Sequence, residues 1–276
     1  MFTSLSPGAI GVAVDSLDQG LALAARHGFA GYHFAIDQAV ELGVAQVQDL
    51  CGSHGVRLSA WGFPVDFRGD EGKYRSDLEK LPAQAETAAQ LGVLRTATWL
   101  MPTSDEMTYE ENFAFHVERL RPAAAILADA GISLGLEYVA PKTLWASKAH
   151  PFVHTMAQTA LLCEAVGANV GFLLDCWHWY NAGEGVEDLQ GLALEQVVDV
   201  HVNDAPAGVP VDEQLDNVRT LPGETGVIDI AGFLGALRAK GYSGPVMVEP
   251  FSQRLREMAA DEACAATGAA LRRVWG

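Results

Sequence analysis

Four short apolar runs in this sequence each end in a residue that can bind a metal ion or carry a proton. The runs cover residues 134–137, 171–175, 197–201 and 245–249, and their ends supply Glu137, Asp175, His201 and Glu249. Three carboxylates and one imidazole form an oxygen-rich ligand set that suits Mn²⁺, Mg²⁺, Co²⁺ or, less selectively, Zn²⁺. We therefore expect one shared divalent metal ion, with Mn²⁺ as the first choice.

A single carboxylate at a strand end could equally be a helix cap or a surface charge. Four ionisable groups beside apolar runs are harder to explain separately, because burying an unpaired charge is costly and a divalent cation is a common partner for several carboxylates. His178 follows Asp175 by three residues, so it can face the same cavity. The alternative is a histidine that is hydrogen-bonded within a loop.

These residues belong to a regular alternation of expected strands and helices. We predict strands at 9–14, 31–35, 56–62 and 94–100, followed by the four strands that carry the candidate ligands. Helices are expected at 16–27, 40–54, 78–91, 109–130, 152–166, 230–240 and 261–274, with a kink or break at Pro122 and a polar loop at 66–77. Residues 204–225 form one long irregular connection, which is typical of a lid or binding loop.

Eight strand–helix units in 276 residues favour a closed (β/α)₈ TIM barrel, in a single domain spanning residues 1–276, over an open sheet. Active sites of such barrels lie where the carboxyl ends of the strands meet. A barrel therefore brings together ligands from its last four strands, whereas an open sheet would spread the same strand ends along a line.

Composition and charge limit the partners. The formal net charge of −17 makes nucleic acid and anionic membranes unfavourable partners. No signal peptide or membrane-spanning run is evident, so a cytoplasmic location is expected. Four cysteines without a C-x-x-C pair predict reduced thiols rather than a disulfide framework or a thiolate zinc site.

The combined pattern resembles the sugar phosphate isomerase and epimerase family of xylose isomerase-like TIM barrels. The segments that carry the resemblance are Gly-Leu-Glu at 135–137, Leu-Asp-Cys-Trp-His at 174–178, Val-His-Val-Asn-Asp at 200–204 and Val-Glu-Pro at 248–250. The resemblance covers essentially the whole chain. It implies a divalent-metal-dependent isomerase or epimerase that acts on a small sugar, keto-sugar or cyclitol by proton transfer through a metal-stabilised enediolate.

The resemblance also assigns individual roles. It implies that the four ligands hold one metal ion and that Glu137 and Glu249 face each other across the substrate as an acid/base pair. His178 and Arg219 match a histidine and an arginine that contact substrate oxygens in ketose epimerases. Arg219 could otherwise be a solvated loop charge. The group commonly forms dimers or tetramers, so a homodimer or homotetramer is allowed.

Other residues bear on the substrate. Trp99 is the best candidate for a pocket wall among the tryptophans near strand ends, because sugars stack on aromatic rings, although rim packing would also explain it. Thr143 stands where epimerases of known ketohexoses carry a second glutamate, and His33 stands where the wider group often has one. Both differences argue against a simple free ketohexose. Asp229, near the start of a helix, disfavours a phosphate group there.

Three other functions remain open. A lyase such as an inosose or dehydroshikimate-type dehydratase would use the same metal and carboxylates. A nuclease of the endonuclease IV type is disfavoured by the charge and by the lack of histidines at the ends of the third and fourth strands. A non-catalytic sugar-binding protein would have little reason to retain all four ligands.

Overall fold

Eight parallel strands close into a barrel in the computed structural model, which describes residues 1–276. Around the barrel the order is β1-β10-β9-β8-β6-β4-β3-β2. This arrangement confirms the predicted (β/α)₈ barrel. The strands are β1 (Phe2–Leu5), β2 (Gly31–Phe34), β3 (Arg57–Gly62), β4 (Arg95–Trp99), β6 (Ser133–Glu137), β8 (Val170–Asp175), β9 (Val197–Val202) and β10 (Pro245–Val248).

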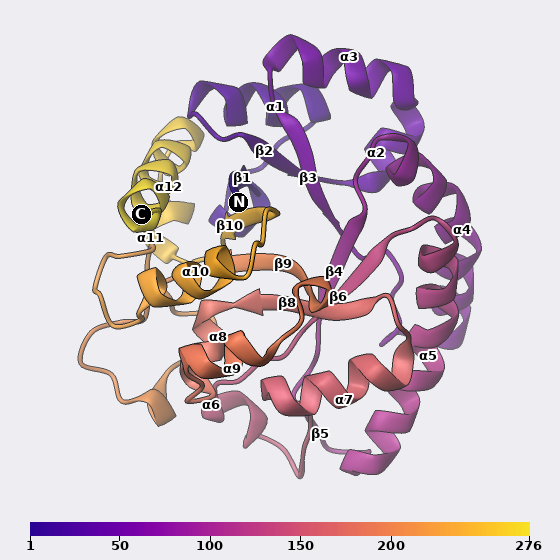
Figure 1. Cartoon of the computed structure of the whole chain (residues 1–276), viewed down its shortest axis with the longest axis vertical. Helices are drawn as coiled ribbons and strands as arrows, with labels where there is room; N and C mark the ends of the chain where they lie inside the picture. Colours follow the sequence, from indigo (N-terminus) through magenta and orange to yellow (C-terminus); the bar gives the residue numbers. More distant parts are fainter.

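Helices surround the strands on the outside (Figure 1). The longer ones are α1 (Leu17–Arg26), α2 (Ile36–Leu42), α3 (Val44–His54), α4 (Glu71–Gln90), α5 (Tyr109–Asp129), α7 (Met156–Val166), α10 (Ile230–Ala239) and α12 (Ala260–Val274). Shorter helices lie in the connections: α6 (Lys142–Trp145), α8 (Cys176–Asn181), α9 (Val186–Gly191) and α11 (Gln253–Arg256), with 3₁₀ turns η1 (Gly8–Ile10), η2 (Leu194–Gln196) and η3 (Val211–Glu213). A small antiparallel sheet, β5 (Thr103–Ser104) with β7 (His150–Pro151), lies outside the barrel. None of the helices combines the length and apolarity needed to cross a lipid bilayer.

The first strand differs from the prediction. It is Phe2–Leu5, whose residues pair with β10 and β2, whereas residues 9–14 form a 3₁₀ turn and coil after Pro7. Ile10 and Val12 are nevertheless buried in the core. The run 9–14 is therefore apolar because it packs as irregular chain, and its apolarity alone cannot separate that state from a strand.

Two helical predictions also needed correction. The expected loop at 66–77 contains the start of α4 at Glu71, where the Asp70 side chain accepts a hydrogen bond from the Lys73 backbone N–H. The expected helix at 40–54 is divided at Gly43, whose φ of 81° breaks the helical path. By contrast, α5 continues through Pro122 without a break.

Strand register sets the position of the candidate ligands. Asp175 on β8 lies opposite His201 on β9, and His201 lies opposite Met247 on β10. Because alternate residues of a strand share a face, Glu249 continues the inward face of Met247. Glu137 on β6 lies opposite Trp99 on β4. The register thus places all four candidate ligands around one end of the barrel.

Candidate metal centre and active site

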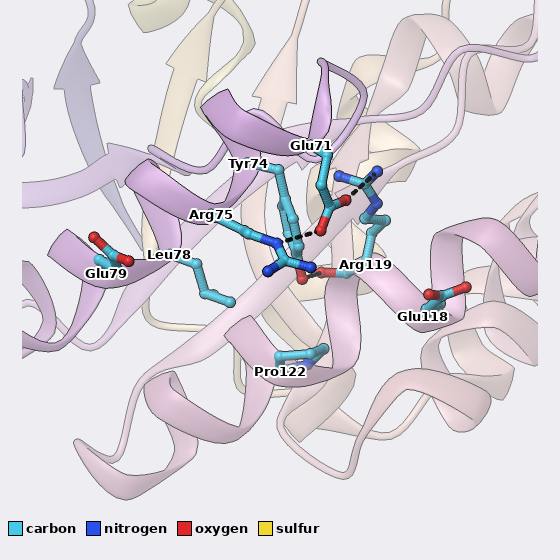
Figure 2. A pocket seen from close by; sticks show the side chains of 8 residues that line it. All are labelled: Glu71, Tyr74, Arg75, Leu78, Glu79, Glu118, Arg119 and Pro122. Carbon is cyan, nitrogen blue, oxygen red and sulfur yellow. Dashed lines mark hydrogen bonds and ion pairs between the residues drawn. The ribbon is translucent and has the colours of Figure 1, made fainter.

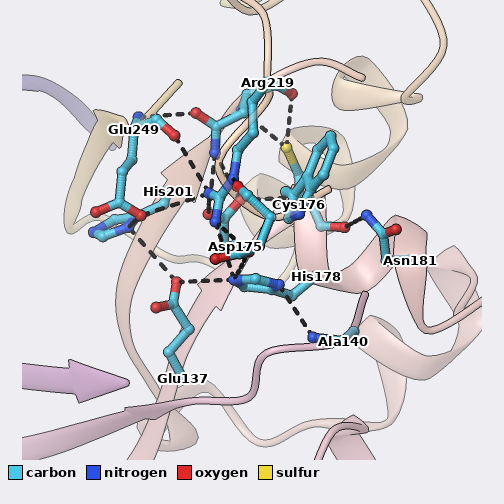
Figure 3. A network of polar contacts seen from close by, with 12 residues as sticks. Glu137, Ala140, Asp175, Cys176, His178, Asn181, His201, Arg219 and Glu249 are labelled. Carbon is cyan, nitrogen blue, oxygen red and sulfur yellow. Dashed lines mark hydrogen bonds and ion pairs between the residues drawn. The ribbon is translucent and has the colours of Figure 1, made fainter. Parts of the chain in front are cut away.

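The four predicted ligands meet at the carboxyl end of the barrel (Figure 3). One ligand atom from each residue can be chosen so that all four lie within 4.8 Å of one another. Glu137, Asp175 and His201 are buried and Glu249 is partly exposed. Each ligand comes from a different strand: Glu137 from β6, Asp175 from β8, His201 from β9 and Glu249 from the residue directly after β10.

Two atoms of this cluster have no hydrogen-bond partner although they are buried. They are Oε1 of Glu137 and Nδ1 of His201, which lie 3.8 Å apart. Nδ1 of His201 also lies 3.5 Å from Oε2 of Glu249. Buried polar atoms are rarely left unpaired, and a cation would bind the carboxylate oxygen of Glu137 together with Nδ1 of the neutral imidazole. The donor set and its unpaired atoms therefore fit a divalent metal ion.

The surroundings of Glu137 and Glu249 shift the pKa values of these two glutamates in opposite directions. Burial, reinforced by the charge of Glu249, raises the pKa of Glu137 well above its usual value. Burial has the same tendency at Glu249, but its neighbours His201 and Arg219 lower the pKa of Glu249 overall. Burial disfavours protonation of His201, yet the charges of Glu249 and Glu137 raise its pKa to about 10. Without a bound cation, one glutamate thus favours the acid form and the other the carboxylate.

Asp175 is held by three donors that fix its orientation. Its Oδ1 accepts from the Trp177 backbone N–H at 2.8 Å, which makes Asp175 the N-cap of α8. The Asn203 side-chain nitrogen lies 3.0 Å from each carboxylate oxygen, and Nη1 of Arg219 lies 2.8 Å from Oδ2. Burial raises the pKa of Asp175, although the Arg219 charge opposes that shift.

His178 reaches the same cavity because α8 begins immediately after Asp175. Its Nδ1 accepts a hydrogen bond from the Ala140 backbone N–H at 3.2 Å. Burial and the charges of Arg219 and His201 lower the pKa of His178 well below its usual value, so the ring is neutral. A neutral ring with Nδ1 as acceptor carries its proton on Nε2. Nε2 faces the pocket, where it lies 3.4 Å from Nη2 of Arg219 and 3.9 Å from Oε1 of Glu137.

Arg219 is buried rather than solvated, which excludes the surface-charge alternative. Its Nη2 bonds to Oδ1 of Asp216 at 2.9 Å, and its Nε donates to the Asp216 carbonyl at 2.9 Å. Its guanidinium also lies over the ring of Phe251, 4.6 Å from the centroid. The irregular connection after β9 thus places the buried guanidinium of Arg219 beside the candidate metal site.

A cavity of about 430 Å³ opens beside these residues. Glu137, His178, Arg219 and Glu249 line it, and Trp99 contributes a wall that is 41% exposed. The guanidinium of Arg68 lies over the ring of Trp99, 4.2 Å from the centroid. Trp99 is therefore placed where the sequence predicted a pocket wall, whereas Trp61 and Trp177 are fully buried in the core.

Sequence reasoning missed three residues of this site. Asn203 links the ligands, because its Oδ1 also accepts from the Glu249 backbone N–H at 2.9 Å. It lies two residues after His201, so strand alternation could have placed it on the same face. Asp216 and Phe251 also line the cavity. Both lie in irregular segments, and Phe251 has a positive φ of 40°, so no periodic pattern points to either.

The loop at 223–228, which precedes α10 and would be the place for a phosphate group, is already filled by a protein carboxylate. Oδ2 of Asp204 accepts from the backbone N–H groups of Thr225 and Gly226, and its Oδ1 accepts from that of Ile228. Asp229 caps α10 by accepting from the Gly232 N–H. A phosphate group would need these same backbone N–H donors. Because Asp204 and Asp229 already accept from them, the loop has a structural role and does not offer a phosphate site.

Another hollow lies on the outer surface between α4 and α5 (Figure 2). It has a volume of about 600 Å³. Glu71 crosses it with ion pairs to Arg75 at 2.5 Å and to Arg119 at 2.8 Å. The hollow is lined only by residues of α4 and α5 on the outside of the barrel, and none of the candidate ligands lines it, so we place the candidate site at the barrel mouth.

Comparisons with known proteins agree with the barrel fold. A family model described as xylose isomerase-like TIM barrel matches residues 21–272. A curated inosose isomerase from Halalkalibacterium halodurans is 29% identical over 197 residues, which cover 70% of this chain and 66% of that protein.

Two solved structures are also similar. A xylose isomerase domain protein from Alicyclobacillus acidocaldarius subsp. acidocaldarius has 31% identity and a TM-score of 0.88, covering 99% of this chain and 98% of that one. The IolI protein, solved with a bound zinc atom, has 23% identity and a TM-score of 0.80, covering 99% and 98% of the two chains.

Proposed function

This chain belongs to the xylose isomerase-like TIM barrel family, and from that membership we propose that it is a divalent-metal-dependent isomerase or epimerase of a neutral keto-sugar or keto-cyclitol. The observation that carries the proposal is the convergence of Glu137, Asp175, His201 and Glu249, with unpaired buried atoms on Glu137 and His201. The inosose isomerase relative supports a cyclitol substrate. Mn²⁺ is the first ion to test, with Mg²⁺, Co²⁺ and Zn²⁺ as alternatives, and the zinc in the IolI structure supports a divalent site.

Glu137, Asp175, His201 and Glu249 would hold the cation. When bound, it would act as a Lewis acid that polarises the substrate carbonyl and stabilises negative charge on the neighbouring oxygens. Glu137 and Glu249 come from different strands and both line the cavity, so one could accept a proton from a substrate carbon and the other could return one. Glu249 would remove the proton from the carbon next to the carbonyl, and Glu137 would return one.

The site of proton return decides the product. Return to the opposite face of the same carbon gives epimerisation, and return to the former carbonyl carbon gives isomerisation. The Nε2–H of His178 and the guanidinium of Arg219 would bind substrate oxygens, and Trp99 would pack against the C–H face of the ring. Substitution of Arg219 by Ala should therefore raise KM.

The charges of the pocket favour a neutral substrate. Arg219 is the one cation that lines the 430 Å³ cavity, and Asp175 and Asp216 already pair with it. Three carboxylates, those of Glu137, Asp216 and Glu249, line the same space. A substrate that carries a phosphate or carboxylate would lack a free partner there. This arrangement disfavours a dehydroshikimate-type dehydratase, whose substrate is a carboxylate.

The proposal is tested by measuring metal content and solvent-deuterium incorporation on one sample. Purified protein is incubated in D₂O with a panel of inososes and ketoses, and exchanged positions are read by NMR. Exchange at the carbon next to the carbonyl, without loss of water, supports isomerase or epimerase chemistry. Loss of water from the product would indicate a lyase. A metal-free protein that shows no exchange after each candidate cation is added would contradict the proposal.

A further inference from the structure

The candidate pocket has a second lobe across the barrel mouth from His178 and Arg219. We call the 430 Å³ cavity the first lobe; the second lobe is a cavity of about 290 Å³. Four residues line both lobes: Trp99, Glu137, Glu249 and Phe251. The second lobe extends toward β1, β2 and β3, which stand opposite β8 in the barrel order. The two glutamates therefore stand between the two lobes.

Small residues at strand ends create the second lobe. Gly8 and Ala9 follow β1, Gly62 ends β3, and Ala97 lies in β4. A Cβ atom placed on Gly8 would meet nothing within 4 Å, and one placed on Gly62 would meet only Cε1 of His33, at 4.0 Å. The lobe is thus open space beside the proton-carrying groups, large enough for part of a substrate.

His33 is the unpaired imidazole of this lobe. It lies on β2, is partly buried, and makes no hydrogen bond or ion pair with the rest of the chain. Burial and the positive charge of His201 lower its pKa to about 4, although Glu249 opposes this shift, and Asp199 also lines the lobe. A neutral imidazole offers one donor and one acceptor, which matches a hydroxyl group and not an anion.

We propose that His33 is a specificity-determining residue whose imidazole, unpaired within the chain, binds a substrate hydroxyl in the second lobe. The inference rests on the proposed function, and it adds a requirement on substrate size. The substrate must carry hydroxyl groups on both sides of the reacting carbons, so that one end reaches His178 and Arg219 and the other reaches His33. Six-carbon rings and chains satisfy this requirement, whereas three-carbon keto-alcohols do not.

The first test compares His33→Ala with wild type on an inosose and on its monodeoxy analogues, each of which lacks one hydroxyl. We expect His33→Ala to lower kcat/KM for the inosose about 10-fold, mainly through KM, the size of one lost hydrogen bond with its partner left unpaired. For one analogue, the kcat/KM of wild type should be lower than for the inosose by the same factor. His33→Ala should not lower kcat/KM for that analogue any further. His33→Asn, which keeps a donor and an acceptor, should restore part of the loss. His154→Ala, on a histidine stacked against Trp145 and lining neither lobe, is the control.

A second variant keeps the test valid if His33→Ala does not fold. Gly62→Ala adds a methyl group at an ordinary contact distance from His33, and Gly62 does not have a positive φ, so the barrel should tolerate it. It should raise KM for the inosose and leave metal content unchanged. If each variant lowers kcat/KM by the same factor for the inosose and for every analogue, the inference is overturned while the proposed function stays intact.

Binding of inositols, the reduced polyols, separates the two claims because it needs no turnover. Isothermal titration calorimetry should show weaker binding of myo-inositol to His33→Ala than to wild type. If that difference is found in a protein that catalyses no proton exchange, the inference on His33 stands and the proposed function fails. If wild type binds neither inositol nor inosose, both are overturned.

Discussion

Nη1 of Arg219 lies 2.8 Å from Oδ2 of Asp175, and both side chains are almost completely enclosed. Removing one partner of a buried ion pair leaves the other unpaired, which costs about 3–5 kcal/mol. We predict that Arg219→Met lowers the free energy of unfolding of the metal-free protein by about that amount. Added Mn²⁺ should recover part of the loss, because a cation that binds the folded state gives Asp175 a new partner.

Urea unfolding with and without Mn²⁺ measures this effect. The control is Arg26→Met, because Arg26 also pairs with an aspartate at 2.7 Å, but on the surface. Exposed pairs contribute little, so this variant should unfold almost as wild type does. Equal losses in the two variants would show that the Arg219–Asp175 pair has no special weight.

Asn203 joins two candidate ligands through one amide group, because it donates to Asp175 and accepts from the Glu249 backbone. Residues that orient metal ligands typically contribute 10–100-fold to affinity. We expect Asn203→Leu to weaken Mn²⁺ binding by about 10–100-fold, measured by competition with a chelator. The surface variant Asn217→Leu, at the rim of the first lobe, is the comparison; an Asn203→Leu affinity equal to wild type would assign Asn203 a purely structural role.

Metal binding should release protons. The charges of Glu249 and Glu137 overcome burial to raise the pKa of His201 to about 10, so the metal-free protein holds that proton at neutral pH. A metal ion binds the neutral imidazole, so affinity should rise about tenfold per pH unit for each proton released, up to the pKa of His201. Calorimetry in two buffers of different ionisation enthalpy counts the protons. His201→Asn should release fewer, and a pH-independent affinity in wild type would refute this prediction.

Glu184 should make stability depend on pH. Burial raises its pKa from 4.5 to about 7, although hydrogen bonds from Tyr138 and the Met156 backbone oppose the shift. The folded state therefore holds this proton at pH values where the unfolded chain has lost it. This contribution is largest below pH 4.5 and is lost as the pH rises to about 7, by roughly 3 kcal/mol. Glu184→Gln should flatten the unfolding free energy over this range, and an unchanged slope would contradict the assignment.

The strand ends were the predictable part of this molecule. Each of the four candidate ligands follows a buried apolar run, and a closed barrel allows only one meeting place for such ends. His178 could be placed through its spacing from Asp175, and Arg219 through the resemblance to ketose epimerases. The structure brings all six together, while their roles in catalysis remain predictions. The oligomeric state and the cytoplasmic location also remain predictions.

The rest depends on tertiary contacts that a single sequence does not encode locally. The run at 9–14 is apolar because Ile10 and Val12 pack against the core, although a short polar-containing segment, Phe2–Leu5, forms the strand. The start of α4 at Glu71 follows a cap in a highly charged segment, so no apolar period announces it. Asp216 lies in the irregular connection after β9, so its place beside the cavity depends on how that connection packs against the barrel and not on a local sequence pattern.

The central claim is that Glu137 and Glu249 move the substrate proton, and solvent-deuterium exchange in their glutamine variants tests it most directly. The substrate is the best-exchanging inosose or ketose of the panel, and each variant is first checked for metal content and folding. Glu184→Gln, which removes a partly buried carboxyl outside both lobes, is the control. We predict that Glu137→Gln and Glu249→Gln each lower exchange by at least about 10²–10⁴-fold while the control stays near wild type. Near-normal exchange in either glutamine variant would contradict the account.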